Sequence, residues 1–110
     1  MARARQLVFT KTLQSAAASG NGTGQFVGNA EVLNIAIVWS AGGSAGVLSI
    51  EEADDDTYAG TWSVITTVTQ AAASSEDFVH ISGGVRAIRA RLTTGVTSGT
   101  VTVTVRGYSG

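Results

Sequence analysis

The chain has 110 residues, of which 44% are hydrophobic and 14% are charged, and its formal net charge is −1. A chain of this length forms one domain, and its apolar content excludes intrinsic disorder. Its charge balance does not favour a nucleic-acid partner. Because it contains no Cys, disulfides, thiolate metal sites and cysteine nucleophiles are excluded.

The first residues of the chain are basic and polar. Arg3, Arg5 and Lys11 interrupt the apolar run that a signal peptide needs, so we expect no Sec export. No segment approaches the roughly 18 apolar residues of a membrane span, so we expect no membrane partner. Residues 1–6 are predicted to form an N-terminal arm, and residues 7–110 to form a single β-sandwich domain.

Eight short segments alternate apolar and polar residues in the manner of half-buried strands. In chain order they span residues 6–13, 23–28, 31–39, 46–52, 60–68, 77–82, 85–94 and 100–107. Between them lie segments rich in Gly, Ser, Ala, Asn and Asp, among them a small-residue connection at 14–22. The last segment is the clearest, because Val101, Val103 and Val105 alternate with threonines.

About eight strands at intervals of about 8–12 residues, with no convincing helix, are typical of a β-sandwich or barrel. The uneven connections favour an all-β, antiparallel sandwich of the jelly-roll type. Its core is expected to consist of the apolar residues on the inward faces. These are Leu33, Ile35, Ile37, Trp39, Leu48, Ile50, Trp62, Val64, Ile88, Leu92, Val101, Val103 and Val105.

The densest polar cluster is acidic and comprises Glu51, Glu52, Asp54, Asp55 and Asp56, at the end of one predicted strand and in the loop that follows it. Its carboxylates could hold Ca²⁺, with Asp54 and Asp56 as ligands, but the spacing of an EF-hand loop is absent. We favour a solvated hairpin loop. The single histidine, His80, is expected to be structural, because no nucleophile motif accompanies it. We therefore expect no catalytic residues, no enzymatic activity, no cofactor and no metal.

One basic cluster occurs near the C-terminus, where Arg89 and Arg91 are expected to point the same way from one strand. Arginine is suited to pairing with a carboxylate on a neighbouring chain, and exposed charges are few elsewhere. The alternative is an ordinary exposed pair on an edge face. Arg3 and Arg5 are the other candidate partner-binding residues, in an arm that would dock on a neighbouring subunit or shell.

Two segments resemble a pattern of small bacteriophage virion proteins. The first runs from Val47 to Val68, in which a strand enters an acidic hairpin and a Gly-Thr-Trp strand follows. The second is FVHISGGVRAIRARLTTGVTSGTVTVTVRG, and together the similarity covers about Val38–Gly107. The resemblance implies a head decoration (cement) protein of a tailed phage, of a group that is often jelly-roll-like and trimeric. The chain departs from the pattern at its three-Asp loop, which usually reads Asp-Gly.

The leading functional hypothesis is therefore a non-enzymatic virion protein that binds the major capsid shell from outside, after assembly in the host cytoplasm. Low charge density and a small aliphatic core also predict a homo-oligomer, with a trimer favoured. The alternative is a carbohydrate- or receptor-binding module of a phage fibre or surface protein. Its candidate stacking groups are Trp39, Tyr58, Trp62 and Tyr108.

Overall fold

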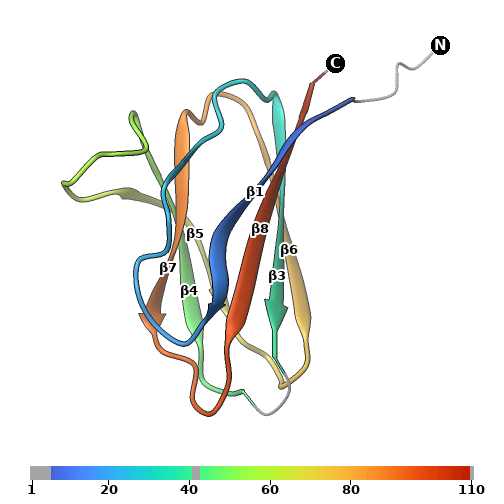
Figure 1. Ribbon diagram of the computed structural model, residues 1–110, viewed down its shortest axis with the longest axis vertical. Coiled ribbons are helices and arrows are strands. Elements are labelled where there is room, and N and C mark those ends of the chain that lie inside the picture. Colours follow the sequence, from blue (N-terminus) through green and yellow to red (C-terminus); the bar gives the residue numbers. More distant parts are fainter. Residues whose placement is uncertain (1–5, 41–42, 110) are drawn as a thin grey trace.

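The computed structural model describes residues 6–40 and 43–109, and in them eight strands form two four-stranded antiparallel sheets (Figure 1). The strands are β1 (Gln6–Ala17), β2 (Gln25–Phe26), β3 (Val32–Trp39), β4 (Val47–Ala53), β5 (Ser63–Thr69), β6 (Glu76–Ser82), β7 (Ala87–Thr94) and β8 (Val101–Ser109). The described residues contain no helix long and apolar enough to cross a membrane.

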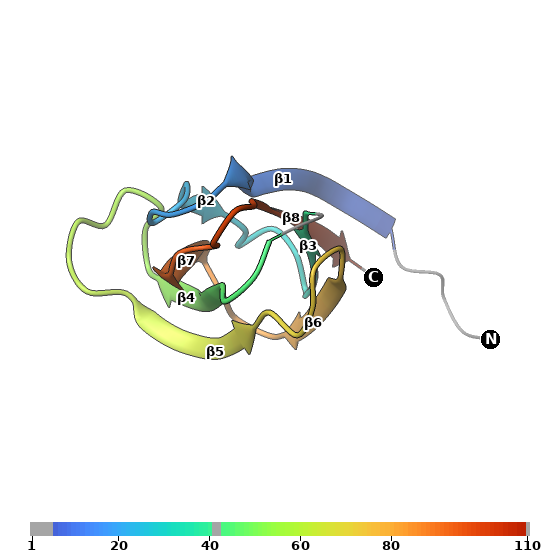
Figure 2. The ribbon, with the colours of Figure 1, turned by 90° about the horizontal axis from the view of Figure 1, so that it is seen from below.

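The strand order identifies the fold as a jelly roll. The first sheet has the order β1-β8-β3-β6, and the second sheet has the order β2-β7-β4-β5. The chain thus pairs β1 with β8, β2 with β7, β3 with β6 and β4 with β5, as when one long hairpin is wrapped over two layers. Figure 2 shows the two sheets in a view along the strands. The predicted eight-stranded antiparallel sandwich of the jelly-roll type is confirmed.

The core lies between the two sheets and is built almost wholly from aliphatic side chains. The inward residues of β3 and β8 are nearly inaccessible, and those of β4 and β7 close the core from the second sheet. The buried apolar residues that form this cluster are Leu13, Val27, Leu33, Ile35, Ile37, Trp39, Leu48, Ile50, Val85, Ile88, Ala90, Leu92, Val96, Val101, Val103 and Val105. Most of the predicted core is therefore confirmed.

The prediction that Val64 belongs to the core is wrong, because 57% of this residue is exposed. Ile50 pairs with Thr66 while Glu51 pairs with Val64, so Ile65 is an extra residue in β5. Such a β-bulge reverses the alternation of the strand. Ile65 packs against the core in place of its neighbour.

The first strand is longer than predicted, since β1 continues to Ala17 where a connection was expected from residue 14. Two irregularities allow this extension: Gln14 pairs with Val103, and Ala17 pairs with Val101, each after a shift in register. The Gln14 amide is buried and donates to the carbonyl of Ala90 at 2.7 Å. A hydrogen bond from the Gln14 side chain to the second sheet is therefore present where the small residues predicted a connection.

Candidate functional site

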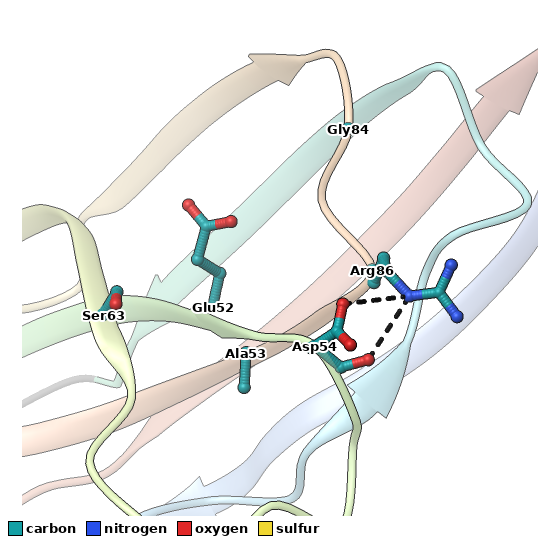
Figure 3. Close-up of a pocket in the computed structure, with 6 residues that line it drawn as sticks. All are labelled: Glu52, Ala53, Asp54, Ser63, Gly84 and Arg86. Atoms are coloured by element: carbon teal, nitrogen blue, oxygen red, sulfur yellow. Dashed lines mark hydrogen bonds and ion pairs between the residues drawn. The ribbon is translucent and has the colours of Figure 1, made fainter.

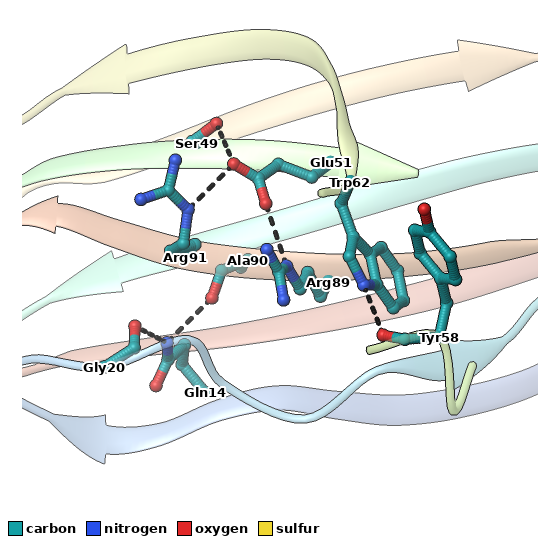
Figure 4. Close-up of polar contacts among 9 residues, drawn as sticks. All are labelled: Gln14, Gly20, Ser49, Glu51, Tyr58, Trp62, Arg89, Ala90 and Arg91. Atoms are coloured by element: carbon teal, nitrogen blue, oxygen red, sulfur yellow. Dashed lines mark hydrogen bonds and ion pairs between the residues drawn. The ribbon is translucent and has the colours of Figure 1, made fainter. Parts of the chain in front are cut away.

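The outer face of the second sheet carries a compact group of polar and charged side chains from its two central strands. In the register of β4 and β7, Ser49 lies opposite Arg91 and Glu51 lies opposite Arg89. The buried residues Ile50 and Ala90 lie between them in sequence and face the core. The strand period of two therefore places all four polar side chains on the outer face (Figure 4). We call these four residues and Trp62 the arginine cluster.

Glu51 is the centre of the arginine cluster and is only 1% exposed although it faces outward. Its carboxylate accepts hydrogen bonds from Arg89 Nε at 2.8 Å, Arg91 Nε at 2.9 Å and Ser49 Oγ at 2.9 Å. Burial raises the pKa of Glu51, but the hydrogen bonds from Arg89, Ser49 and Arg91 outweigh burial and hold this pKa below its ordinary value of 4.5. The carboxylate is therefore ionised at neutral pH.

Trp62 covers one side of the arginine cluster. The guanidinium carbon of Arg89 lies 4.8 Å from the centre of the indole ring, in a cation–π contact. The indole Nε1 donates to the carbonyl of Tyr58 at 2.9 Å, which ties the ring to the β4–β5 loop. Gly24 makes room on the other side, because a Cβ there would lie 3.0 Å from Cη2 of the ring. Trp62 is buried as predicted, but it lies outside the main core.

The predicted arginines are accordingly in a different setting from the one expected. Arg89 and Arg91 do point the same way, but β7 is a central strand and not an edge. Their side chains are 17% and 38% exposed, and both pair with Glu51 of the same chain. Their predicted role toward a neighbouring chain stays a prediction. Arg3 and Arg5 lie outside the described residues.

Sequence reasoning missed Glu51, which it grouped with the acidic loop, and it assigned Trp62 to the core. The signal for Glu51 was present, because it shares strand parity with Ser49 and is thus directed outward from a strand whose Leu48 and Ile50 are buried. The strand pairing that places it beside Arg89 could not be found, because those residues are far apart in the sequence.

The acidic loop that follows β4 forms local contacts. Asp54 pairs with Arg86 Nε at 3.3 Å, and both side chains are exposed. Asp55 accepts from the backbone N and the hydroxyl of Thr57 at 2.9 Å each, which lowers its pKa. Among residues 6–40 and 43–109, no group of three His, Asp or Glu side chains is arranged to hold a metal ion. In this part of the chain, Asp54 and Asp56 are therefore not joined by a third acidic or histidine side chain placed to hold an ion.

An open hollow lies beside this loop, between the start of β5 and the β6–β7 connection (Figure 3). Glu52 points into it, Ser63 and Gly84 lie at its rim, and the Asp54–Arg86 pair closes its far side. This hollow is shallow and polar, and its arginine is already paired with a carboxylate.

The outer face of the first sheet differs in character from the arginine cluster. Its outward side chains include the charged residues Glu76 and Arg106, but Val38 and Phe78 are also 45% and 54% exposed. In register, Phe78 lies beside Ala36, and Val38 lies between Thr102 and Glu76. His80 is exposed on the same face.

The carbohydrate alternative depended on four aromatic side chains. Trp39 is 1% exposed in the core, and its Nε1 donates to Asp77 at 2.9 Å, while Trp62 is 4% exposed over Arg89. Tyr58 is half exposed and Tyr108 is partly exposed. Neither tryptophan ring is available to stack on a sugar.

No family model matches the chain, and no curated protein is significantly similar to it in sequence. Among solved structures, the chain is similar to the SPBc2 prophage-derived protein YomS, with a TM-score of 0.69. The match covers 99% of this chain and 98% of that one, at 17% sequence identity. The likeness shows that the two chains share their fold over nearly their whole length.

Proposed function

We propose that this chain is a non-enzymatic structural protein of a tailed-phage virion that binds the outside of the capsid shell as a decoration protein. The observation that carries the proposal is the shared fold with a prophage-derived protein, which extends over nearly all of both chains. The resemblance of Val38–Gly107 to small virion proteins points the same way. Assembly would occur in the host cytoplasm, and the major capsid protein would be the partner.

The chemistry of the first sheet supports this role. The outer face of the first sheet has few charges and exposes Val38 and Phe78. Contacts with protein partners are depleted in charged residues and enriched in aromatic ones at their centre. A shell subunit is the occupant that we propose for this face.

A homotrimer is the proposed assembly, because several copies bound to a repeating shell reinforce one another. Linked contacts can raise the overall affinity by a factor of about 10²–10⁴ without any new contact. Sedimentation equilibrium of the purified chain would give its mass in solution. A trimer is expected, and a monomer at micromolar concentration would contradict this part of the proposal.

Particles from the strain that encodes the chain provide the direct test of shell binding. We expect the chain to be present in purified particles at a copy number in a simple ratio to the major capsid protein, as measured by quantitative mass spectrometry. We also expect purified chain to rebind particles made without its gene. Its absence from full particles, together with failure to rebind, would overturn the proposed function.

A further inference from the structure

We infer that Arg89 and Arg91 form a binding site for a carboxylate side chain of a partner protein. The inference deepens the proposed function and rests on it where the partner is taken to be a second shell subunit, different from the one that covers the first sheet. Its basis is the arginine cluster, in which two guanidinium groups share one carboxylate at the surface of the second sheet.

The charges of the arginine cluster do not balance. Glu51 supplies one negative charge, and Arg89 and Arg91 supply two positive charges. Within the described part of the chain, every ion pair of these two arginines goes to Glu51. The cluster therefore carries one excess positive charge, in a protein whose net charge is −1.

The hydrogen-bonding groups of the two arginines are also only partly used. A guanidinium has five N–H donors, and pairing through both prongs of its fork is its strongest mode. Here each arginine reaches Glu51 through Nε alone, and the Nη atoms form no hydrogen bond with other described residues. In Figure 4 the Nη atoms of Arg91 point away from the carboxylate. The Nη groups of both arginines are thus free to donate hydrogen bonds to a second carboxylate.

The two arginines are held in place before any ligand arrives. Glu51 fixes both Nε atoms, and Trp62 lies against the guanidinium of Arg89. Restraint of this kind lowers the entropy that binding would otherwise cost. Arg91 is 38% exposed and Arg89 is 17% exposed, so a ligand would reach Arg91 first.

The excess of a single positive charge favours a carboxylate over a polyanion. Nucleic acid is bound by surfaces that neutralise many phosphates, which need a larger basic patch than two arginines. A planar carboxylate matches a guanidinium fork in both geometry and charge. The ligand is therefore an Asp or Glu side chain of a partner.

A titration of the ¹⁵N-labelled chain with a capped tripeptide, acetyl-Gly-Glu-Gly-amide, tests the site at low salt. We expect saturable NMR shifts of Trp62 Nε1–H and of the Nε–H groups of Arg89 and Arg91, with none from the matched Gly-Gln-Gly peptide. Arg91→Gln should weaken binding about tenfold, because a bond between charged partners is lost. Arg106→Gln, on the first sheet, is the control and should leave binding unchanged.

Several outcomes would overturn the inference: no saturable shift, equal shifts from the Gln peptide, or equal loss in Arg91→Gln and Arg106→Gln. Saturation by inorganic phosphate but not by the Glu peptide would also overturn it. If Arg91→Gln does not fold, Arg91→Lys keeps the charge, loses the fork and should also bind the peptide more weakly.

Rebinding to particles separates this inference from the proposed function. If the unmodified chain rebinds and Arg91→Gln rebinds equally well, the inference about the shell is wrong and the proposed function stands. If the unmodified chain does not rebind, the proposed function fails, and the peptide titration still decides whether the carboxylate site exists.

Discussion

The outer faces of the two sheets come from strands with the same alternating pattern, but they differ in which outward side chains are buried. On the second sheet, outward Glu51 is 1% exposed because Arg89, Arg91 and Ser49 bind it and Trp62 covers Arg89. On the first sheet, Val38 and Phe78 are 45% and 54% exposed. A charged residue is thus buried on the second sheet, although Val64 beside it is 57% exposed, while an aromatic residue is exposed on the first sheet.

The difference arises from what lies over each sheet. Trp62, at the end of the β4–β5 loop, packs against Arg89 on the second sheet, so the ionic group loses water and must satisfy its own hydrogen bonds. No described segment contributes a comparable aromatic cover to the residues around Phe78. The second sheet therefore buries a charged group on its outer face, whereas the first sheet leaves Val38 and Phe78 exposed.

Replacing the buried carboxylate of Glu51 should cause the largest loss of stability. Glu51→Ala leaves two guanidinium groups without their partner, and we expect a loss of about 3 kcal/mol in the free energy of unfolding, at the lower end for a buried pair because Arg91 is partly exposed. Urea denaturation at neutral pH measures it. The matched control is Glu76→Ala, on the exposed face of the first sheet, which should stay within about 0.5 kcal/mol. Equal losses in both variants would remove the distinction between the two faces.

Removing the indole ring of Trp62 should cause the next largest loss of stability. Trp62→Ala should cost about 2 kcal/mol, less than a core aromatic, because the ring lies outside the main core and packs on Arg89. Phe78→Ala, the exposed aromatic of the other face, should change the free energy of unfolding by less than about 0.5 kcal/mol. Thermal denaturation of the two variants checks the comparison, and a larger loss for Phe78→Ala would contradict it.

Protonation of Glu51 should lower the stability by a smaller amount, which can be measured as a pH dependence. Its pKa is lower in the folded chain than the ordinary value of 4.5, so its ionisation stabilises the fold above pH 4.5. This stabilisation is lost as the pH falls below 4.5 and through the lower folded pKa. We therefore expect the difference in stability between the unmodified chain and Glu51→Gln to shrink over this range. A difference that stays constant from pH 7 into acid would contradict the assignment.

The smallest effect on stability is expected from polar substitutions on the open face. Val38→Ser combined with Phe78→Ser should leave the unfolding free energy within about 0.5 kcal/mol but should weaken rebinding to particles. Val64→Ser is the control, since Val64 is 57% exposed on β5 of the second sheet. If all the variants rebind equally, the open face is not the surface that contacts the shell.

Much of the fold follows from the sequence, because strand alternation is a local property. Val101, Val103 and Val105 are buried as their spacing predicts, and the eight strands lie close to their predicted positions. The two errors concern irregular backbone: the bulge at Ile65 and the extension of β1 to Ala17. Both depend on the partner strand, which is β4 for the bulge in β5 and β8 for the extension of β1. The alternation of residues within a strand gives no signal of how that strand pairs with its partner.

The candidate site was predicted only in part. The shared direction of Arg89 and Arg91 followed from their spacing of two residues, but their partner did not. Glu51 is 38 and 40 residues away in sequence from these arginines, and only the register of β4 against β7 brings them together. Except at Val64, where a bulge reverses the alternation of β5, the sequence by itself determined which side chains face outward, because alternation fixes direction along a strand. The tertiary structure alone decided which outward residues are buried, because this depends on the strand that pairs beside them and the loop that covers them.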